Sequence, residues 1–164
     1  MPLHRVSVLG GTDPLARAEF LEAAAEAGRL FASEGITLLY DGGSQGPIGE
    51  LAAAFQSAHG MALQVPAEQL GEHTDALLAL PGGHETLEQL LETGLGVTSV
   101  PEPPLGLLNT ADYFSGLLKS SGDGVLERFV HESQRGRLIV QRDAAELLRA
   151  MAEYRPPETR RQQA

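Results

Sequence analysis

Short apolar runs alternate along the chain with longer stretches whose apolar residues recur every three or four positions. Short runs of this kind are typical of buried strands, and the longer recurrence is typical of amphipathic helices. The pattern predicts strands over residues 5–10, 36–40, 61–65, 75–80, 104–108 and 138–141. It predicts helices over residues 14–33, 46–57, 86–97, 111–120 and 144–154.

Local signals mark the ends of the first and last helices. Asp13 is predicted to cap the first helix, with Pro14 at its first position and Gly35 after its end. Asp143 is predicted to cap the last helix in the same way. The first helix is expected to bury one apolar stripe, formed by Phe20, Ala23, Ala24, Ala27, Leu30 and Phe31.

Regular alternation of strands and helices is typical of a parallel sheet with helices on both faces. The expected fold is therefore α/β, a Rossmann-like three-layer arrangement in a single domain over residues 1–154. The polar, basic segment over residues 155–164 is expected to be a disordered tail.

Composition excludes several classes of function. The formal net charge of −10 argues against a nucleic-acid binder and against an anionic membrane surface, since both attract basic proteins. The absence of Cys excludes disulfides and thiolate metal sites. No leader or membrane span is evident in the sequence, so a cytoplasmic location is expected.

Three Gly-rich turns follow predicted strands, at the edge of a parallel sheet where ligands bind. Their backbone N–H groups could hold a phosphate at a helix N-terminus, although tight strand-to-helix turns need Gly in any case. None of them is a Walker A loop or a complete GxGxxG fingerprint. The candidate phosphate- or nucleotide-binding residues are Gly10, Gly11, Thr12, Gly42, Gly43, Ser44, Gly46, Gly82, Gly83 and Thr86.

Two of these turns resemble the signatures PGGxGTxxE and GGGxxGLMG of the Lonely Guy (LOG) family. Residues 81–89 read PGGHETLEQ and residues 41–49 read DGGSQGPIG. The segment 104–109, followed by Tyr113-Phe114 and by residues 133–135, is similar to the C-terminal half of that family. The resemblance implies a homodimer without a cofactor, which binds adenine-type nucleoside 5′-monophosphates such as AMP or cytokinin nucleotides. It implies hydrolysis of their N-glycosidic bond to a free base and ribose 5-phosphate.

Three departures from the family pattern fall on functional positions. The position of the family's catalytic Glu is occupied by Gln89, and a neutral amide cannot take a proton from water. Glu85 replaces a Gly, where a carboxylate repels a docked phosphate. The interval 66–74 contains no Arg or Lys, so the family's Arg-Lys motif is missing. The candidate catalytic residues are therefore Glu85, which shares a helix face with Gln89, together with Glu88 and Gln89 itself.

Other interpretations stay open on the sequence alone. A binding or carrier protein for a nucleotide or a molybdenum-cofactor-type ligand would keep the cleft without the chemistry, and a third alternative is a regulatory or purely structural dimer. His84 and Glu88 have the spacing of metal ligands, with His59 or His73 as a third, but solvent-facing side chains are the preferred interpretation and no metal site is predicted. A dimer partner could supply a missing Arg, for which the candidates are Arg128, Arg135 and Arg137.

Overall fold

Eleven elements make up the part of the chain that the computed structural model describes, which is residues 3–82, 102–115 and 137–156 with positions 86, 88, 89 and 92. The strands are β1 (Arg5–Leu9), β2 (Thr37–Tyr40), β3 (Ala62–Gln64), β4 (Ala76–Ala79), β5 (Leu105–Leu108) and β6 (Leu138–Gln141). The helices are α1 (Ala18–Ser33), α2 (Gly46–Ser57) and α6 (Ala144–Glu153), with short 3-10 helices η1 (Ala67–Gln69) and η2 (Thr110–Asp112).

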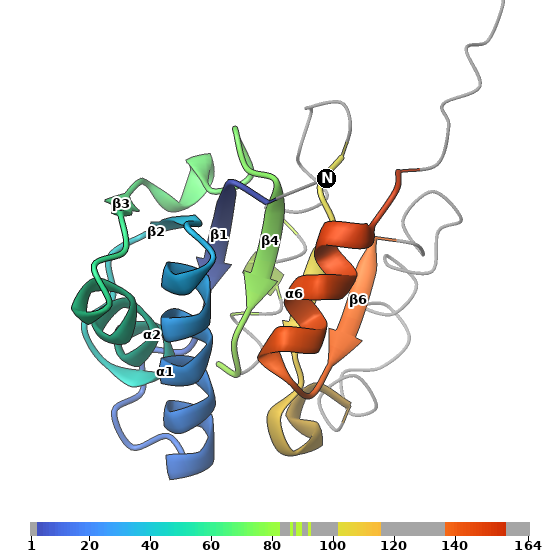
Figure 1. The fold of residues 1–164 in the computed structure, drawn as a ribbon. Helices are drawn as coiled ribbons and strands as arrows, with labels where there is room; N and C mark the ends of the chain where they lie inside the picture. The colour runs from blue at the N-terminus through green and yellow to red at the C-terminus, as the bar shows by residue number, and fades with distance from the viewer. Residues whose placement is uncertain are drawn as a thin grey trace, which may run out of the picture.

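The six strands form one parallel sheet in the order β3-β2-β1-β4-β5-β6 (Figure 1). The chain builds outward from β1 to β3, then returns to the other side of β1 and builds outward again through β4 to β6. This reversal makes the boundary between the paired strands β1 and β4 a topological switch point. In such sheets, ligands bind at the switch point, beyond the carboxyl ends of the strands. The prediction of a single Rossmann-like α/β domain with a parallel sheet is confirmed.

Side chains of successive strand residues alternate between two apolar clusters, one on each face of the sheet. Val6, Val8 and Leu78 belong to the cluster that is covered by α1, α2 and α6, which lie together in front of the sheet in Figure 1. Leu77 and Leu107 face the opposite cluster, which Leu70 and Phe114 help to cover. Most of the segments predicted as helices over 86–97 and 111–120 lie outside the described residues, and so do residues 157–164 of the predicted tail.

The predicted start of the first helix was wrong, because α1 begins at Ala18 and not at Pro14. The Asp13 carboxylate accepts a hydrogen bond from the Leu15 N–H at 2.9 Å, and the Asp13 carbonyl accepts one from the Ala16 N–H at 3.1 Å. Asp side chains favour such local turns as readily as helix caps. The residues before Ala18 therefore form a long loop beyond β1.

Other element ends agree closely with the pattern. The bounds of α2 and β6 are as predicted, and the remaining strands are shorter than predicted by one or two residues. Asp143 caps α6 as expected, since its Oδ1 accepts a hydrogen bond from the Glu146 N–H at 3.0 Å. In α1, four residues of the predicted apolar stripe are buried, namely Phe20, Ala24, Ala27 and Phe31.

Arg137 lies inside its own chain, so it is not available to a dimer partner, and that sequence hypothesis was wrong for this residue. Its side chain is 1% exposed, its Nε donates to the Pro103 carbonyl at 2.9 Å, and it pairs with Glu102 at 3.5 Å. It directly precedes β6, at the amino ends of the strands, whereas the switch-point pocket lies beyond their carboxyl ends. Burial lowers the pKa of Arg137, and burial raises the pKa of the neighbouring Tyr154 hydroxyl. Arg128 and Arg135 lie outside the described residues.

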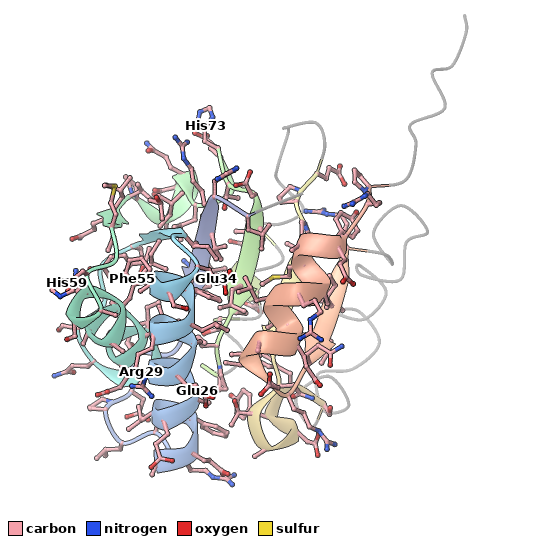
Figure 2. The ribbon with its side chains drawn as sticks, viewed as in Figure 1. Glu26, Arg29, Glu34, Phe55, His59 and His73 are labelled. Atoms are coloured by element: carbon pink, nitrogen blue, oxygen red, sulfur yellow. The ribbon has the colours of Figure 1, made fainter. Side chains whose placement is uncertain are left out.

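Replacing Gly28 by Ala should destabilise the fold, although Ala is the better helix former. A Cβ at Gly28 would collide with the Leu51 carbonyl oxygen and lie 3.1 Å from the Phe55 nitrogen, where α2 packs on α1 (Figure 2). We expect Gly28→Ala to lower the free energy of unfolding by about 1–3 kcal/mol in urea titrations. The control Ala53→Gly, at an exposed position of α2, should cost only the propensity difference of roughly 0.5–1 kcal/mol. A stabilising Gly28→Ala would show that the two helices are not in close contact.

Tyr154 should make the stability depend on pH in the alkaline range. Because its pKa is raised above the ordinary 10.0 in the folded protein, its contribution is fully present below pH 10 and is lost as pH rises through the folded value. We expect Tyr154→Phe to flatten the fall in unfolding free energy above about pH 10, measured by urea denaturation at a series of pH values. A slope for Tyr154→Phe equal to that of the wild type would contradict the prediction.

Candidate functional site

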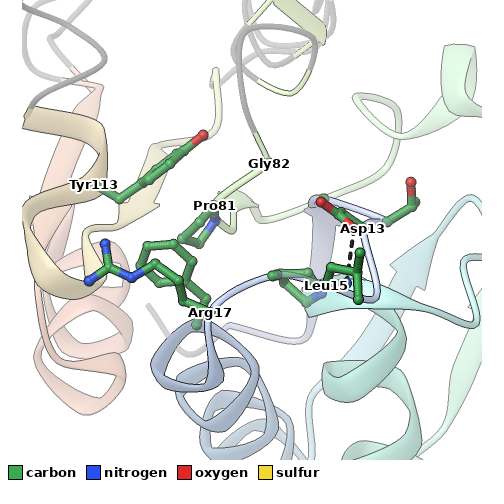
Figure 3. Close-up of a pocket in the computed structure, with 11 residues that line it drawn as sticks. Asp13, Leu15, Arg17, Pro81, Gly82 and Tyr113 are labelled. Carbon is green, nitrogen blue, oxygen red and sulfur yellow. Dashed lines mark hydrogen bonds between the residues drawn. The ribbon is translucent and has the colours of Figure 1, made fainter.

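A pocket of about 510 Å³ lies at the switch point, beyond the carboxyl ends of β1, β4 and β5 (Figure 3). Its volume is within the range of small-molecule binding sites. Four separate segments form its wall: the loop after β1 with the start of α1, the start of α2, the turn after β4, and the turn after β5. The lining residues are Gly11, Thr12, Asp13, Leu15, Ala16, Arg17, Phe20, Pro47, Pro81, Gly82 and Tyr113.

The floor of the pocket is made by backbone that packs directly on backbone. The Gly11 N–H donates to the Pro81 carbonyl at 3.1 Å, and the Gly11 carbonyl accepts from the Ile48 N–H at 3.1 Å. Both backbone groups of Gly11 are thus used inside the protein. The peptide at this position ties together the turns after β1 and β4 and the first turn of α2.

Close approach between the turns explains why several of their residues must be Gly. A Cβ at Gly11 would lie 2.7 Å from the Pro81 carbonyl oxygen, and a Cβ at Gly82 would lie 2.5 Å from the Gly11 nitrogen. Gly46 has a φ of +69°, and a Cβ there would lie 2.6 Å from the Asp13 nitrogen. At these three positions the packing of one turn against another requires Gly, whether or not a ligand binds.

Only part of the predicted phosphate-binding set lines the pocket. Gly11, Thr12 and Gly82 line it, and Thr86 is 5% exposed and lies against Gly82. The other predicted residues of the turns, among those described, do not line the pocket: Gly10, Gly42, Gly43, Ser44 and Gly46. Gly83 lies outside the described residues.

The predicted catalytic residues follow the turn after β4. Glu88 is exposed and Gln89 is half-buried, and both are helical. Glu85 lies outside the described residues. The position that carries the family's carboxylate therefore presents an amide, which holds hydrogen bonds but carries no charge.

Sequence reasoning missed the side chains that form one wall of the pocket. The Phe20 and Tyr113 rings meet edge to face with centroids 5.2 Å apart, and the Arg17 guanidinium lies 5.1 Å from the centre of the Phe20 ring. Arg17 also pairs with Glu19. In Figure 3, Tyr113 and Arg17 lie on one side of the pocket, and Asp13 and Leu15 lie on the other. No local sequence pattern marks Arg17 as a pocket residue, because the other parts of the wall come from distant segments of the chain.

The charged groups of the pocket are few. Arg17 is the one Lys or Arg among the described lining residues, and Asp13 is the one carboxylate. The Leu15 side chain is 89% exposed at the rim, so an apolar group stands open beside the cavity. The wall can therefore offer a ligand one cation, one anion, the hydroxyls of Thr12 and Tyr113, and two aromatic rings.

The His residues with metal-ligand spacing do not converge in the part of the chain that is described. His59 follows α2 and His73 precedes β4, and their side chains stand at separate places on the surface (Figure 2). No three His, Asp or Glu side chains among the described residues come together around a metal ion. His84 lies outside those residues. No described helix is long and apolar enough to cross a membrane.

Comparison with known folds gives similarity over nearly the whole chain. A molybdenum cofactor carrier protein from Chlamydomonas reinhardtii superposes with a TM-score of 0.70 at 18% identity, covering 92% of this chain and 97% of that one. A molybdenum cofactor binding protein from Rippkaea orientalis superposes with a TM-score of 0.65 at 18% identity, covering 93% and 99%. At this identity the likeness concerns the fold alone.

Comparison of sequences identifies the family. The probable cytokinin riboside 5′-monophosphate phosphoribohydrolase LOGL5 of Oryza sativa subsp. japonica is 32% identical over 94% of this chain and 74% of its own length. The cytokinin riboside 5′-monophosphate phosphoribohydrolase LOG3 of Arabidopsis thaliana is 29% identical over 93% and 84%. The family model described as "Possible lysine decarboxylase" matches residues 58–151. The chain therefore belongs to the LOG family of cytokinin riboside 5′-monophosphate phosphoribohydrolase-like proteins.

Proposed function

We propose that the chain binds a nucleoside 5′-monophosphate in the switch-point pocket and hydrolyses its N-glycosidic bond slowly. The observation that carries the proposal is the composition of the pocket wall, where a cation, polar groups and an aromatic ring surround one cavity. These groups match the three parts of a nucleotide, which are an anionic phosphate, a hydroxylated ribose and a flat base. Relatives named for action on such nucleotides support the choice of ligand.

The parts of the ligand are assigned by chemistry. Arg17 and the turn at Gly82 and Thr86 bind the phosphate, because a cation and a helix start both favour an anion. Asp13 and Thr12 accept or donate hydrogen bonds at the ribose hydroxyls. The Tyr113 ring packs on the base, since every base has a flat π face.

The chemical step breaks the bond between C1′ of the ribose and the base, and water adds to C1′. A carboxylate speeds such a step by taking a proton from the water and by offsetting the positive charge that develops on the ribose. Gln89 supplies neither effect, so the slow reaction depends on another carboxylate. Glu85 and Glu88 are the candidates in the adjacent sequence.

The proposal includes the assembly and the location of the protein. Like the family pattern, it describes a cytoplasmic homodimer that needs no cofactor and whose partner is a small nucleotide and not a nucleic acid. The strongly negative net charge supports the absence of a nucleic-acid partner, because it repels the negatively charged phosphates of a nucleic-acid backbone. Light scattering on the eluting protein measures the assembly directly.

A second candidate function is binding without hydrolysis. The observation that favours it is Gln89, which stands where the family has its catalytic Glu. Replacing that carboxylate by an amide removes a catalytic group and leaves the binding pocket in place. In this case the protein would store or carry a nucleotide or a molybdenum-cofactor-type ligand. The two functions differ only in whether free base appears.

Restoring the carboxylate should raise the rate of hydrolysis. We expect Gln89→Glu to release base from AMP or isopentenyl-AMP about 100-fold faster than the wild type, which is the scale of general acid–base catalysis. Base release is measured by chromatography, and nucleotide affinity is measured separately by calorimetry. Glu88→Gln and Glu85→Gln show which carboxylate supports the wild-type rate.

The outcomes separate the two functions. Slow release by the wild type, accelerated in Gln89→Glu, supports the hydrolase. Binding of AMP without release by either protein supports the carrier and overturns the hydrolase. No binding of AMP at all overturns the assignment of the pocket to nucleotides.

Removing the pocket cation should weaken binding of the phosphate. We expect Arg17→Ala to lower the affinity for AMP by about tenfold and to leave the affinity for adenosine nearly unchanged, since the lost interaction is charge-assisted. Arg29→Ala is the matched control, because Arg29 is an exposed Arg on α1, the helix that follows Arg17, and does not line the pocket (Figure 2). Equal losses for AMP and adenosine would show that Arg17 does not contact the phosphate.

A further inference from the structure

The turn that carries Tyr113 is organised by one buried amide. Asn109 is 4% exposed, and its Oδ1 accepts hydrogen bonds from the Phe114 N–H at 2.8 Å and the Ser115 N–H at 3.3 Å. Its Nδ2 donates to the Ser115 Oγ at 2.9 Å. Its backbone N–H donates to the Gln141 carbonyl at 2.8 Å, at the end of β6. The side chain thus connects the end of β5 to the backbone on the far side of Tyr113.

The backbone inside this loop is strained. Ala111 and Asp112 have φ values of +53° and +57°, which side chains with a Cβ rarely adopt. Two consecutive residues of this kind cost free energy that the surroundings must offset, and such strain gathers at functional sites. Asp112 is tied to the turn before α6 by Arg142, whose Nε and a terminal nitrogen reach Asp112 Oδ1 at 2.8 Å and 2.7 Å.

The strained turn directs one aromatic ring into the pocket wall. Tyr113 meets the Phe20 ring edge to face on one side and the Phe114 ring, at 5.3 Å and 82°, on the other. Phe114 is fully buried, so Tyr113 is held against the core at its base while its ring stands at the cavity (Figure 3). The position of the ring therefore depends on the direction in which the chain leaves the turn.

We propose that Asn109 is a positioning residue, which holds the Tyr113 ring at the angle needed to pack on the base of the bound nucleotide. The ligand part of this proposal rests on the proposed function. The geometric part does not, because it concerns how one buried amide orders one ring. An amide is suited to this task because a single side chain accepts two N–H groups and donates to a hydroxyl at the same time.

The position of the ring is measured by fluorine NMR on protein labelled with 3-fluorotyrosine. The chain has three Tyr and no Trp, so three resonances are expected, and Tyr113→Phe assigns the one of interest. We expect Asn109→Ala to shift or broaden the Tyr113 resonance and to leave those of Tyr40 and Tyr154 in place. Asn109→Asp should restore the wild-type signal, because a carboxylate still accepts both N–H groups and the Ser115 hydroxyl can turn to donate.

Two further variants separate positioning from general loss of stability. Ser115→Ala removes one hydrogen bond of the amide, and we expect it to shift the Tyr113 resonance less than Asn109→Ala does. It provides the test if Asn109→Ala does not fold. Asp75→Ala is the matched control, because the Asp75 side chain also accepts two backbone N–H groups, those of His4 and Arg5, at the opposite end of the strands. It should leave the Tyr113 resonance unchanged.

The effect on the ligand is measured by calorimetry with AMP and with ribose 5-phosphate. We expect Asn109→Ala to lower the affinity for AMP about tenfold, the scale of base stacking on an aromatic ring, and Asn109→Asp to recover it. Ribose 5-phosphate, which has no base, should bind both variants as it binds the wild type. Equal losses for the two ligands would overturn the assignment of the ring to the base.

The two arms fail separately. If the wild type does not bind AMP, the proposed function fails, and the NMR experiment still decides whether Asn109 orders Tyr113. An unmoved Tyr113 resonance in folded Asn109→Ala overturns the positioning role, whatever the protein binds.

Discussion

The contact on which the site depends is the hydrogen bond from the Gly11 N–H to the Pro81 carbonyl, where the turns after β1 and β4 meet. After β1 the chain continues to one side of the switch point, and after β4 it continues to the other side. Such a reversal leaves a crevice between the two turns that follow these strands. Here Gly at positions 11 and 82 lets the two backbones touch, and Gly46 brings the start of α2 under the same point. The contact closes the floor of the pocket and sets how deep a ligand can enter.

This packing makes side chains the main contribution of the loop after β1 to the pocket wall. In many nucleotide sites the N–H groups of a Gly-rich turn bind the phosphate directly. In this chain the Gly11 N–H is already paired inside the protein, so the loop after β1 contributes Asp13 and Arg17 to the wall instead. The late start of α1 makes this possible, because it leaves both residues in the loop at the cavity.

The wall that contains Tyr113 depends on residues that do not themselves line the pocket. Tyr113 reaches the pocket from the turn after β5, and that turn is held by Asn109 and by the pair between Asp112 and Arg142. Exposed ion pairs contribute little stability, so the buried amide carries most of the constraint. The pocket is therefore assembled from both halves of the sheet, which meet where β1 pairs with β4.

The sequence determined the fold class, the order of strands and helices, and the family. The fold class follows from local periodicity, which sets which face of each element is buried. The family follows from two short motifs, at residues 41–49 and 81–89. The caps of α6 and the bounds of α2 were readable for the same reason, since hydrogen bonds within a few residues decide them. The motif at residues 81–89 also showed that Gln89 replaces the charged Glu of the family.

Tertiary structure decided which of these residues form the site. Asp13 could cap a helix or close a turn, and the two choices differ by little free energy until the loop packs beside Gly46. Arg17, Phe20 and Tyr113 meet only because the sheet brings distant segments together, so no local pattern marks them. Arg137 resembled a free surface cation in the sequence, and only the burial of its side chain beside Pro103 and Glu102 shows that it serves its own fold.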